Sequence, residues 1–168
     1  MAGGKGTRIS SITNDEIPKP MLTVGNKPIL EHQIDCLKKS GVNEVIIVTG
    51  HLGNKIKEYF GNGDNIGINI SYYEENPDKP LGTAGSLYYL KDKINEDFIL
   101  IFGDVFLSVD FNRMIKYHKE KKSDATLLTH PNSHPFDSDL VVVNEMGKVL
   151  SFDSKDNTRD YDYNNLVN

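Results

Sequence analysis

Hydrophobic and polar positions along this chain follow two periods in turn, that of a helix and that of a strand. Residues 26–41 (NKPILEHQIDCLKKSG) have Leu30, Ile34 and Leu37 at helical spacing, and Gly41 suits the position after a helix. Residues 43–50 (NEVIIVTG) follow as a short, continuously apolar run, which is typical of a strand buried on both faces. The first half of the chain therefore predicts a helix followed by a buried strand.

The same alternation continues to residue 153. Three further stretches predict helices, with Thr83 and Asp110 as expected N-caps: 53–61, 83–93 and 110–122. Three more predict strands: 68–75, 97–104 and 125–130. Residues 139–153 predict a β-hairpin with its turn at 144–147.

This order predicts the fold class and the number of domains. Helices alternating with strands indicate an α/β protein, a Rossmann-like three-layer α/β/α arrangement with a mostly parallel sheet and right-handed crossovers. The hairpin adds an antiparallel element near the C-terminal end. A chain of 168 residues favours one domain, covering residues 1–168.

Composition narrows the class of protein. The net charge of −5 argues against a general nucleic-acid-binding protein, which has to neutralise phosphates. Cys36 is the only cysteine, which excludes an intrachain disulfide and a cysteine metal cluster. No apolar run approaches the roughly 18 residues of a membrane span, and we expect no signal peptide. We therefore expect a cytoplasmic protein without a membrane partner.

The loop GGKGTR at residues 3–8 is the first candidate site. Its glycines let backbone N–H groups approach an anion, and Arg8 and Lys5 add positive charge. A polyphosphate would fit, and a solvated glycine turn is the alternative. The spacing matches neither a Walker A loop nor G-x-G-x-x-G.

Two residues further along the chain strengthen the phosphate interpretation. Lys19 stands between Pro18 and Pro20, which restrict its backbone, and a preset lysine can neutralise charge on a transferring phosphoryl group. Asp104 ends the predicted strand 97–104, where a carboxylate is well placed to hold Mg²⁺ together with phosphate oxygens. The alternatives are an exposed lysine and a turn aspartate.

The stretch LGTAG at residues 81–85 is the last candidate element. Gly82 and Gly85 flank Thr83 just before a predicted helix, so a flat base or a sugar can lie against the backbone. The alternative is a capped helix start. In an α/β sheet, the loops at the carboxyl ends of the strands form the ligand site, and all these stretches fall there.

The chain resembles the sugar-1-phosphate nucleotidyltransferase family in five motifs that occur in the family's order: GGKGTR, PKPM, GNKPILEH, LGTAGSL and GDV. Its C-terminal part resembles the branch that contains D-glycero-D-manno-heptose 1-phosphate and mannose-1-phosphate guanylyltransferases. The resemblance implies transfer of a nucleotide, with GTP the expected donor, to a sugar 1-phosphate. The products would be an NDP-sugar for surface polysaccharide and pyrophosphate.

The resemblance also implies roles for particular residues. The nucleotide would be bound by these residues: Ala2, Gly3, Gly4, Gly6, Thr7, Arg8, Gly82 and Thr83. The catalytic residues would be Arg8 on the triphosphate, Lys19 between the two phosphates and Asp104 on Mg²⁺. The sugar phosphate would be bound by a second set: Lys19, Thr83, Asp139 and Lys155.

The chain departs from the family pattern after the hairpin. The family has Glu-Lys-Pro where this chain has Asp153, Ser154 and Lys155, so Lys155 is expected to keep the phosphate contact without the glutamate. The position of a second metal carboxylate is not assigned, and Asp139 is the nearest by chemistry. His130 and His134 are expected at the rim of the sugar pocket, with plain loop structure as the alternative.

The two ends of the sequence suggest a fragment of a longer enzyme. In the family, an apolar strand precedes the glycine loop, and here Met1 occupies the position of its last residue. We also expect a strand that starts near the C-terminal NNLVN to continue. Such a fragment alone is expected to bind nucleotide weakly, without efficient turnover.

Two other functions remain open. The same fold could transfer a nucleotide to phosphocholine or another phosphorylated alcohol, because the loop residues read the triphosphate and not the acceptor. A non-catalytic domain that senses a nucleotide or sugar phosphate is the second alternative. The base, the sugar and the oligomeric state are not determined by these motifs, and the edge strands leave room for a homo-oligomer.

Overall fold

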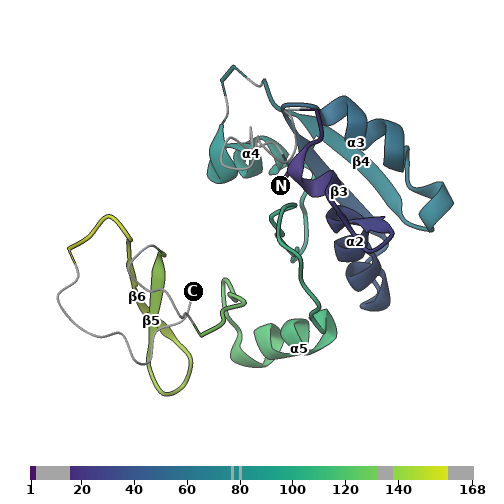
Figure 1. The fold of residues 1–168 in the computed structure, drawn as a ribbon. Helices are drawn as coiled ribbons and strands as arrows, with labels where there is room; N and C mark the ends of the chain where they lie inside the picture. The colour runs from purple at the N-terminus through teal and green to yellow at the C-terminus, as the bar shows by residue number, and fades with distance from the viewer. Residues whose placement is uncertain (3–15, 77, 80, 132–137, 159–168) are drawn as a thin grey trace. The chain divides into compact units, whose positions relative to one another are not determined.

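A computed structural model of the chain describes residues 1–2, 16–76, 78–79, 81–131 and 138–158. These residues form two compact units, Met1–Arg113 and Met114–Asn168, which we describe separately (Figure 1). The first unit contains the helices η2 (Lys19–Met21), α2 (Ile29–Lys39), α3 (Gly53–Phe60), η3 (Asp64–Ile66) and α4 (Gly82–Leu90). Its strands are β1 (Thr23–Val24), β2 (Lys27–Pro28), β3 (Glu44–Thr49) and β4 (Asn69–Glu74).

The remaining elements lie further along the chain. Helix α5 (Phe111–Lys121) begins in the first unit, and its first turn is capped by Asp110, whose carboxylate accepts a hydrogen bond from the Arg113 N–H at 3.2 Å. Strands β5 (Leu140–Val143) and β6 (Val149–Asp153) form the predicted antiparallel hairpin of the second unit. The Asn144 side chain closes its turn by accepting from the N–H groups of Met146 and Lys148.

A parallel pair of strands is the centre of the first unit. Strands β3 and β4 run parallel, in a register that pairs Glu44 with Asn69 and Thr49 with Glu74. Ala2 extends this pairing, because it bridges Thr49 in parallel and its N–H donates to the Val48 carbonyl at 2.8 Å. On its other side, the Gly103 N–H donates to the Met1 carbonyl at 2.8 Å. The backbone order is therefore β4, β3, residues 1–2 and residues 101–103.

The hydrophobic core lies between this strand pair and two helices. Apolar side chains from both helices and both strands form one buried cluster: Leu30, Ile34, Ile47, Ile56, Phe60, Ile68 and Ile70, joined by Ala2. Helix α2 supplies Leu30 and Ile34, at the helical spacing visible in the sequence. Helices α2, α3 and α5, strands β3 and β4, and the hairpin thus confirm the α/β prediction.

Two predicted strands are wrong. Residues 97–104 and 125–130 form no strand, and they leave apolar side chains exposed, such as Phe102 at 51% and Leu128 at 57%. A strand forms only where a neighbour offers hydrogen bonds along its length. Within the described part of the chain, the backbone of residues 101–103 bonds to Met1, to the Gln33 side chain and to the nearby Val105 N–H, and to no strand. A parallel sheet is therefore seen at β3, β4 and residue 2, and not across the predicted full width.

Two smaller predictions also need correction. Helix α4 begins at Gly82 and has Leu81 as its N-cap, so Thr83 lies in the first turn and caps nothing. Strand β3 is buried only at its carboxyl end, over Ile47, Val48 and Thr49. No helix among the described residues has the length and apolarity required to cross a bilayer.

The turn at Gly63 offers a test of the first unit. Gly63 has φ +87°, and an added Cβ would overlap the Ile68 carbonyl oxygen and lie 2.8 Å from Ile70 Cγ1. We expect Gly63→Ala to lower the free energy of unfolding by about 1–3 kcal/mol more than the control Gly25→Ala. Gly25 has φ +66° and open space around it, so the control shares only the backbone strain, about 1–2 kcal/mol. Urea unfolding measures both losses, and equal losses would contradict this account.

Candidate functional site

Lys19 and Asp104 meet at the carboxyl edge of the central strands. The Lys19 ammonium nitrogen lies 3.8 Å from Asp104 Oδ2, and their side chains are 25% and 47% exposed. The pair comes from positions 85 residues apart in the chain and lies beside Ala2, the residue that leads into the glycine loop. A cation and an anion that are close together and partly exposed are suited to bind a charged ligand.

Gly103 makes this meeting possible. An added Cβ at Gly103 would lie 3.1 Å from the Met1 carbonyl oxygen, 3.1 Å from Pro20 Cγ and 3.3 Å from Ala2 Cβ. Residues 1–2 and Pro20 therefore both pack closely against a residue without a side chain. Because Pro20 and Asp104 are the direct neighbours of Lys19 and Gly103, this close approach brings the cation and the carboxylate together.

The N-terminal half of helix α2 supports the Lys19 segment. The Ile29 N–H at the start of α2 donates to the Leu22 carbonyl at 2.9 Å, just after η2. The His32 ring lies 2.9 Å from the Val24 carbonyl, so a second contact joins α2 to β1. Buried Pro20 anchors η2 itself. Lys19 is thus held on a short, supported turn.

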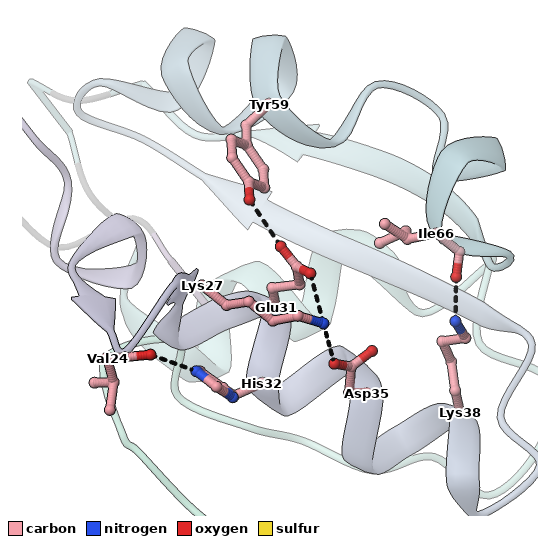
Figure 2. Close-up of polar contacts among 8 residues, drawn as sticks. All are labelled: Val24, Lys27, Glu31, His32, Asp35, Lys38, Tyr59 and Ile66. Carbon is pink, nitrogen blue, oxygen red and sulfur yellow. Dashed lines mark hydrogen bonds and ion pairs between the residues drawn. The ribbon is translucent and has the colours of Figure 1, made fainter.

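A polar cluster joins α2 to α3 (Figure 2). The Lys27 ammonium lies 2.9 Å from Glu31 Oε1 and donates to Asp35 Oδ2 at 2.8 Å, and the Tyr59 hydroxyl donates to Glu31 Oε2 at 2.8 Å. Hydrogen bonds to Asp35 and then Glu31 raise the pKa of the Lys27 ammonium above its ordinary value. The hydrogen bond to Glu31 likewise raises the pKa of Tyr59. The contacts of Lys27 and Tyr59 with Glu31 and Asp35 thus join β2, α2 and α3.

The start of helix α4 is tied to the same edge. The Glu75 N–H donates to the Thr49 carbonyl at 2.8 Å, directly after β4. The buried Ser86 hydroxyl makes hydrogen bonds with the Glu75 carboxylate and, at 2.8 Å, with the Gly82 carbonyl. These contacts connect Gly82 and Thr83 to the strand edge that also carries Ala2.

Burial and two nearby carboxylates act on the pKa of the Met1 amino group. Burial lowers its pKa, while the negative charges of Asp104 and Glu75 act in the opposite direction. Two carboxylates, one exposed and one buried, therefore act on the same point of the backbone. No group of three or more His, Cys, Asp or Glu side chains suited to a metal occurs among the described residues. A cation at Asp104 would need its remaining oxygen ligands from elsewhere.

The structure brings together some of the predicted residues and not others. Lys19 and Asp104 form an ion pair, and Ala2 lies close to Gly103, the neighbour of Asp104. Gly82 and Thr83 lie at the start of α4, which is tied to the same strand edge. The core of the glycine loop lies outside the described residues: Gly3, Gly4, Gly6, Thr7 and Arg8. Their predicted roles stay predictions.

Two of the four residues predicted for the sugar phosphate belong to the second unit. Asp139 and Lys155 are neighbours there, because the Lys155 N–H donates to Asp139 Oδ1 at 3.0 Å across the ends of the hairpin. The His130 ring nitrogen Nδ1 lies 2.9 Å from the Pro131 carbonyl, which is a local loop contact. His134 lies outside the described residues.

Three structural residues of the site were not predicted from the sequence: Gln33, Glu75 and Ser86. Gln33 and Ser86 are polar residues on helices, at 2% and 0% exposure, and Glu75 is a carboxylate at 7% exposure. Gln33 lies next to Ile34 on the apolar side of α2, and this position in the sequence could have indicated that its side chain is buried. A buried polar side chain needs a partner, and its presence on an apolar face indicates one.

Comparison with known proteins identifies the family. Residues 1–166 match the family described as Nucleotidyl transferase. The chain belongs to the nucleotidyl transferase family. It is 32% identical to the UTP–glucose-1-phosphate uridylyltransferase of Synechocystis over 167 residues, which cover 92% of this chain and 43% of that protein. It is 35% identical over 156 residues to the D-glycero-α-D-manno-heptose 1-phosphate guanylyltransferase of Aneurinibacillus thermoaerophilus, covering 92% of this chain and 66% of that protein.

Solved structures agree with the family assignment. A Bacillus anthracis protein assigned as a glucose-1-phosphate thymidylyltransferase, crystallised with sucrose, superposes with a TM-score of 0.80 at 26% identity. The match covers 92% of this chain and 62% of that protein. The chain therefore spans about half to two-thirds of the length of these family members. The nucleotidyltransferase fold predicted from the motifs is confirmed.

The contact between Ser86 and Glu75 can be tested directly. Ser86→Ala leaves the buried Glu75 carboxylate without its hydroxyl partner, so we expect the free energy of unfolding to fall by about 1–3 kcal/mol. Ser71→Ala on exposed β4 is the matched control and should change it by less than about 0.5 kcal/mol. Chemical denaturation measures both, and an equal, small effect would show that this contact does not hold the start of α4.

Proposed function

We propose that this protein is a sugar-1-phosphate nucleotidyltransferase, which joins a nucleoside triphosphate to a sugar 1-phosphate and releases pyrophosphate. The observation that carries the proposal is the pairing of Lys19 with Asp104 beside Ala2, at the entrance to the GGKGTR loop. The family membership and the three relatives named above, all sugar-1-phosphate nucleotidyltransferases by name, support it.

The reaction is an in-line displacement at the α-phosphorus. An oxygen of the sugar phosphate forms the new bond, the bond from the α-phosphorus to the bridging β-oxygen breaks, and its electron pair leaves with pyrophosphate. No covalent enzyme intermediate is needed, so positioning and charge neutralisation account for most of the acceleration. Lys19, held on its turn, can neutralise charge, and a glycine loop can position the phosphates.

Lys19 has the geometry for the central role. Its side chain is one-quarter exposed, so a phosphate can reach it, and its backbone is held between Pro18 and Pro20 at the start of η2. We assign it to the oxygens shared between the α-phosphate and the sugar phosphate, where negative charge is densest. Arg8 is proposed to bind the β- and γ-phosphates and to stabilise the departing pyrophosphate.

Asp104 fits one part of a Mg²⁺ site. Mg²⁺ prefers one or two carboxylates plus phosphate oxygens and water, and Asp104 is an exposed carboxylate next to the phosphate-binding lysine. When bound, Mg²⁺ would neutralise the triphosphate and orient it for displacement. Asp104 would hold the ion, while Lys19 would turn from the carboxylate to the phosphates.

The donor and acceptor are narrower proposals. We favour GTP with a heptose- or mannose-type sugar for surface polysaccharide precursors, supported by the resemblance of the C-terminal part and by the heptose-specific relative. Gly82 and Thr83 would border the base and the sugar, and Asp139 and Lys155 the sugar phosphate. The cytoplasmic location, the absence of nucleic-acid and membrane partners, and a homo-oligomer stay predictions.

A pyrophosphate-release assay tests the activity. The protein, as its natural gene encodes it, is combined with GTP, CTP, UTP, ATP or dTTP and with mannose-, heptose- or glucose-1-phosphate or phosphocholine. We expect release for one pair, lost on chelation of Mg²⁺. Release with phosphocholine alone would show that the acceptor is a phosphorylated alcohol and not a sugar 1-phosphate. No release anywhere, together with a nucleotide-dependent rise in melting temperature, would replace the enzyme by a sensor.

Substitutions at the pair test the assigned roles. Asp104→Asn and Lys19→Met should each lower kcat by about 10²-fold or more, because each removes charge that acts on the reacting phosphates. The controls Asp97→Asn and Lys55→Met change the same residue types at exposed positions away from the pair and should keep full activity. Activity of either pair variant within a few-fold of the unsubstituted protein would contradict its role.

A further inference from the structure

Helix α2 carries one polar side chain that neither the sequence motifs nor the proposed mechanism uses. Gln33 is 2% exposed, on a helix whose other buried side chains include Leu30, Ile34 and Leu37. An amide in such a place is costly unless its hydrogen bonds are made. Its contacts therefore indicate what it is for.

Both hydrogen bonds of Gln33 go to the loop that carries Asp104. Gln33 Nε2 donates to the Phe102 carbonyl at 2.9 Å and to the Val105 carbonyl at 2.5 Å. Carbonyl oxygens only accept, so the atom that faces both of them has to be the nitrogen with its two hydrogens, and this fixes the orientation of the amide. The two acceptors stand on either side of Gly103 and Asp104.

The loop is held from the opposite side as well. The Gly103 N–H donates to the Met1 carbonyl at 2.8 Å, and the Val105 N–H bonds back to the Phe102 carbonyl at 3.3 Å. The dipeptide of Gly103 and Asp104 is thus fixed at both ends by Gln33 and in the middle by Met1. Because residues 97–104 form no strand, these few hydrogen bonds replace the ladder that would otherwise hold the loop.

Neighbouring residues of α2 follow the same loop. The His32 ring packs edge-on against Phe106, with ring centroids 5.2 Å apart, and the Cys36 thiol lies 3.9 Å from the Leu107 carbonyl. These contacts are weaker than the Gln33 bonds and lie beyond Asp104 in the chain. Since the start of α2 also binds Leu22, the same helix supports both the Lys19 turn and the Asp104 loop.

We propose that Gln33 is a positioning residue for Asp104: its side-chain amide sets the loop 102–105 so that the carboxylate faces the metal and the phosphates beside Lys19. This inference rests on the proposed function for its chemistry, while the clamp itself rests on the contacts above. Gln33 does not touch the reacting atoms. Its loss would let Asp104 move away from its productive place without removing any charge from the site.

Hydrogen exchange tests the clamp without reference to activity. In Gln33→Met, which keeps the length of the side chain and removes both donors, the Gly103 and Val105 amides should exchange at least about tenfold faster. The Glu75 amide, bonded to Thr49 in another loop, should exchange unchanged. The control Lys38→Met removes a different bond from α2, the one to the Ile66 carbonyl shown in Figure 2, and should leave Gly103 and Val105 protected.

Magnesium dependence tests the consequence for the reaction. For Gln33→Met, pyrophosphate release should need about three- to tenfold more Mg²⁺ for half-maximal rate, with most of kcat recovered at saturating Mg²⁺, because the carboxylate is displaced and not lost. Asp104→Asn should not recover in this way. Unchanged exchange and unchanged Mg²⁺ dependence in a folded Gln33→Met protein would overturn the proposal.

Two further outcomes concern a Gln33 variant that does not fold and an unsubstituted protein that shows no activity. If Gln33→Met does not fold, Gln33→Asn, which keeps an amide but is too short to reach both carbonyls, is measured instead, and failure of both variants to fold would make Gln33 a purely structural residue and overturn the proposal. If the unsubstituted protein releases no pyrophosphate with any substrate pair, the proposed function fails. The exchange experiment then still decides whether Gln33 fixes the loop.

Discussion

Three backbone hydrogen bonds around Met1 and Ala2 are the constraint on which the described site depends. Ala2 donates to Val48, Met1 donates to Ile101, and Met1 accepts from Gly103, each at 2.8 Å. These bonds place strand β3 and the Asp104 loop on either side of residues 1–2. Through these bonds the carboxyl end of β3 and the loop of Gly103 come to one edge.

Helix α2 holds both charged residues of the candidate site at this edge. Its first turn holds the segment of Lys19, its buried face fills the core, and Gln33 reaches the loop of Asp104. The charged cluster of Lys27, Glu31 and Asp35 with Tyr59 ties the helix to β2 and α3. One helix thus determines the separation of the two charged groups on which the proposed chemistry relies, and a single rigid support suits a reaction driven by positioning.

The site combines local positive charge with an acidic protein. The net charge is −5, yet Lys19 is presented at the ligand edge with a carboxylate only 3.8 Å away. Such a pair suits a polyphosphate that arrives with a divalent cation, because the carboxylate can receive the cation while the ammonium receives the phosphates. A free anion would be attracted by Lys19 and repelled by Asp104. The pairing therefore favours a metal–nucleotide complex over a simple anion as the ligand.

Local sequence patterns were enough to predict the helices α2, α3 and α5, the strands β3 and β4, and the hairpin. Their signals are short-range: apolar spacing in α2, the run Val45–Val48, the cap at Asp110 and the turn at Asn144. The linked motifs also predicted the family. The contact of Lys19 with Asp104 joins a short turn to a loop, and neither residue lies on a strand.

Other features were decided only by tertiary structure. Residues 97–104 are as apolar as β3, but a strand also needs a partner along its length, and periodicity carries no information about that partner. Thr83 is not the N-cap of α4, because the geometry of the preceding loop places Leu81 at that position. The role of Gln33 depends on two carbonyls about 70 residues away in the chain. Sequence by itself determined the local elements and the chemistry available at one edge, whereas the contacts that hold that chemistry in place are long-range and exist only once the chain has folded.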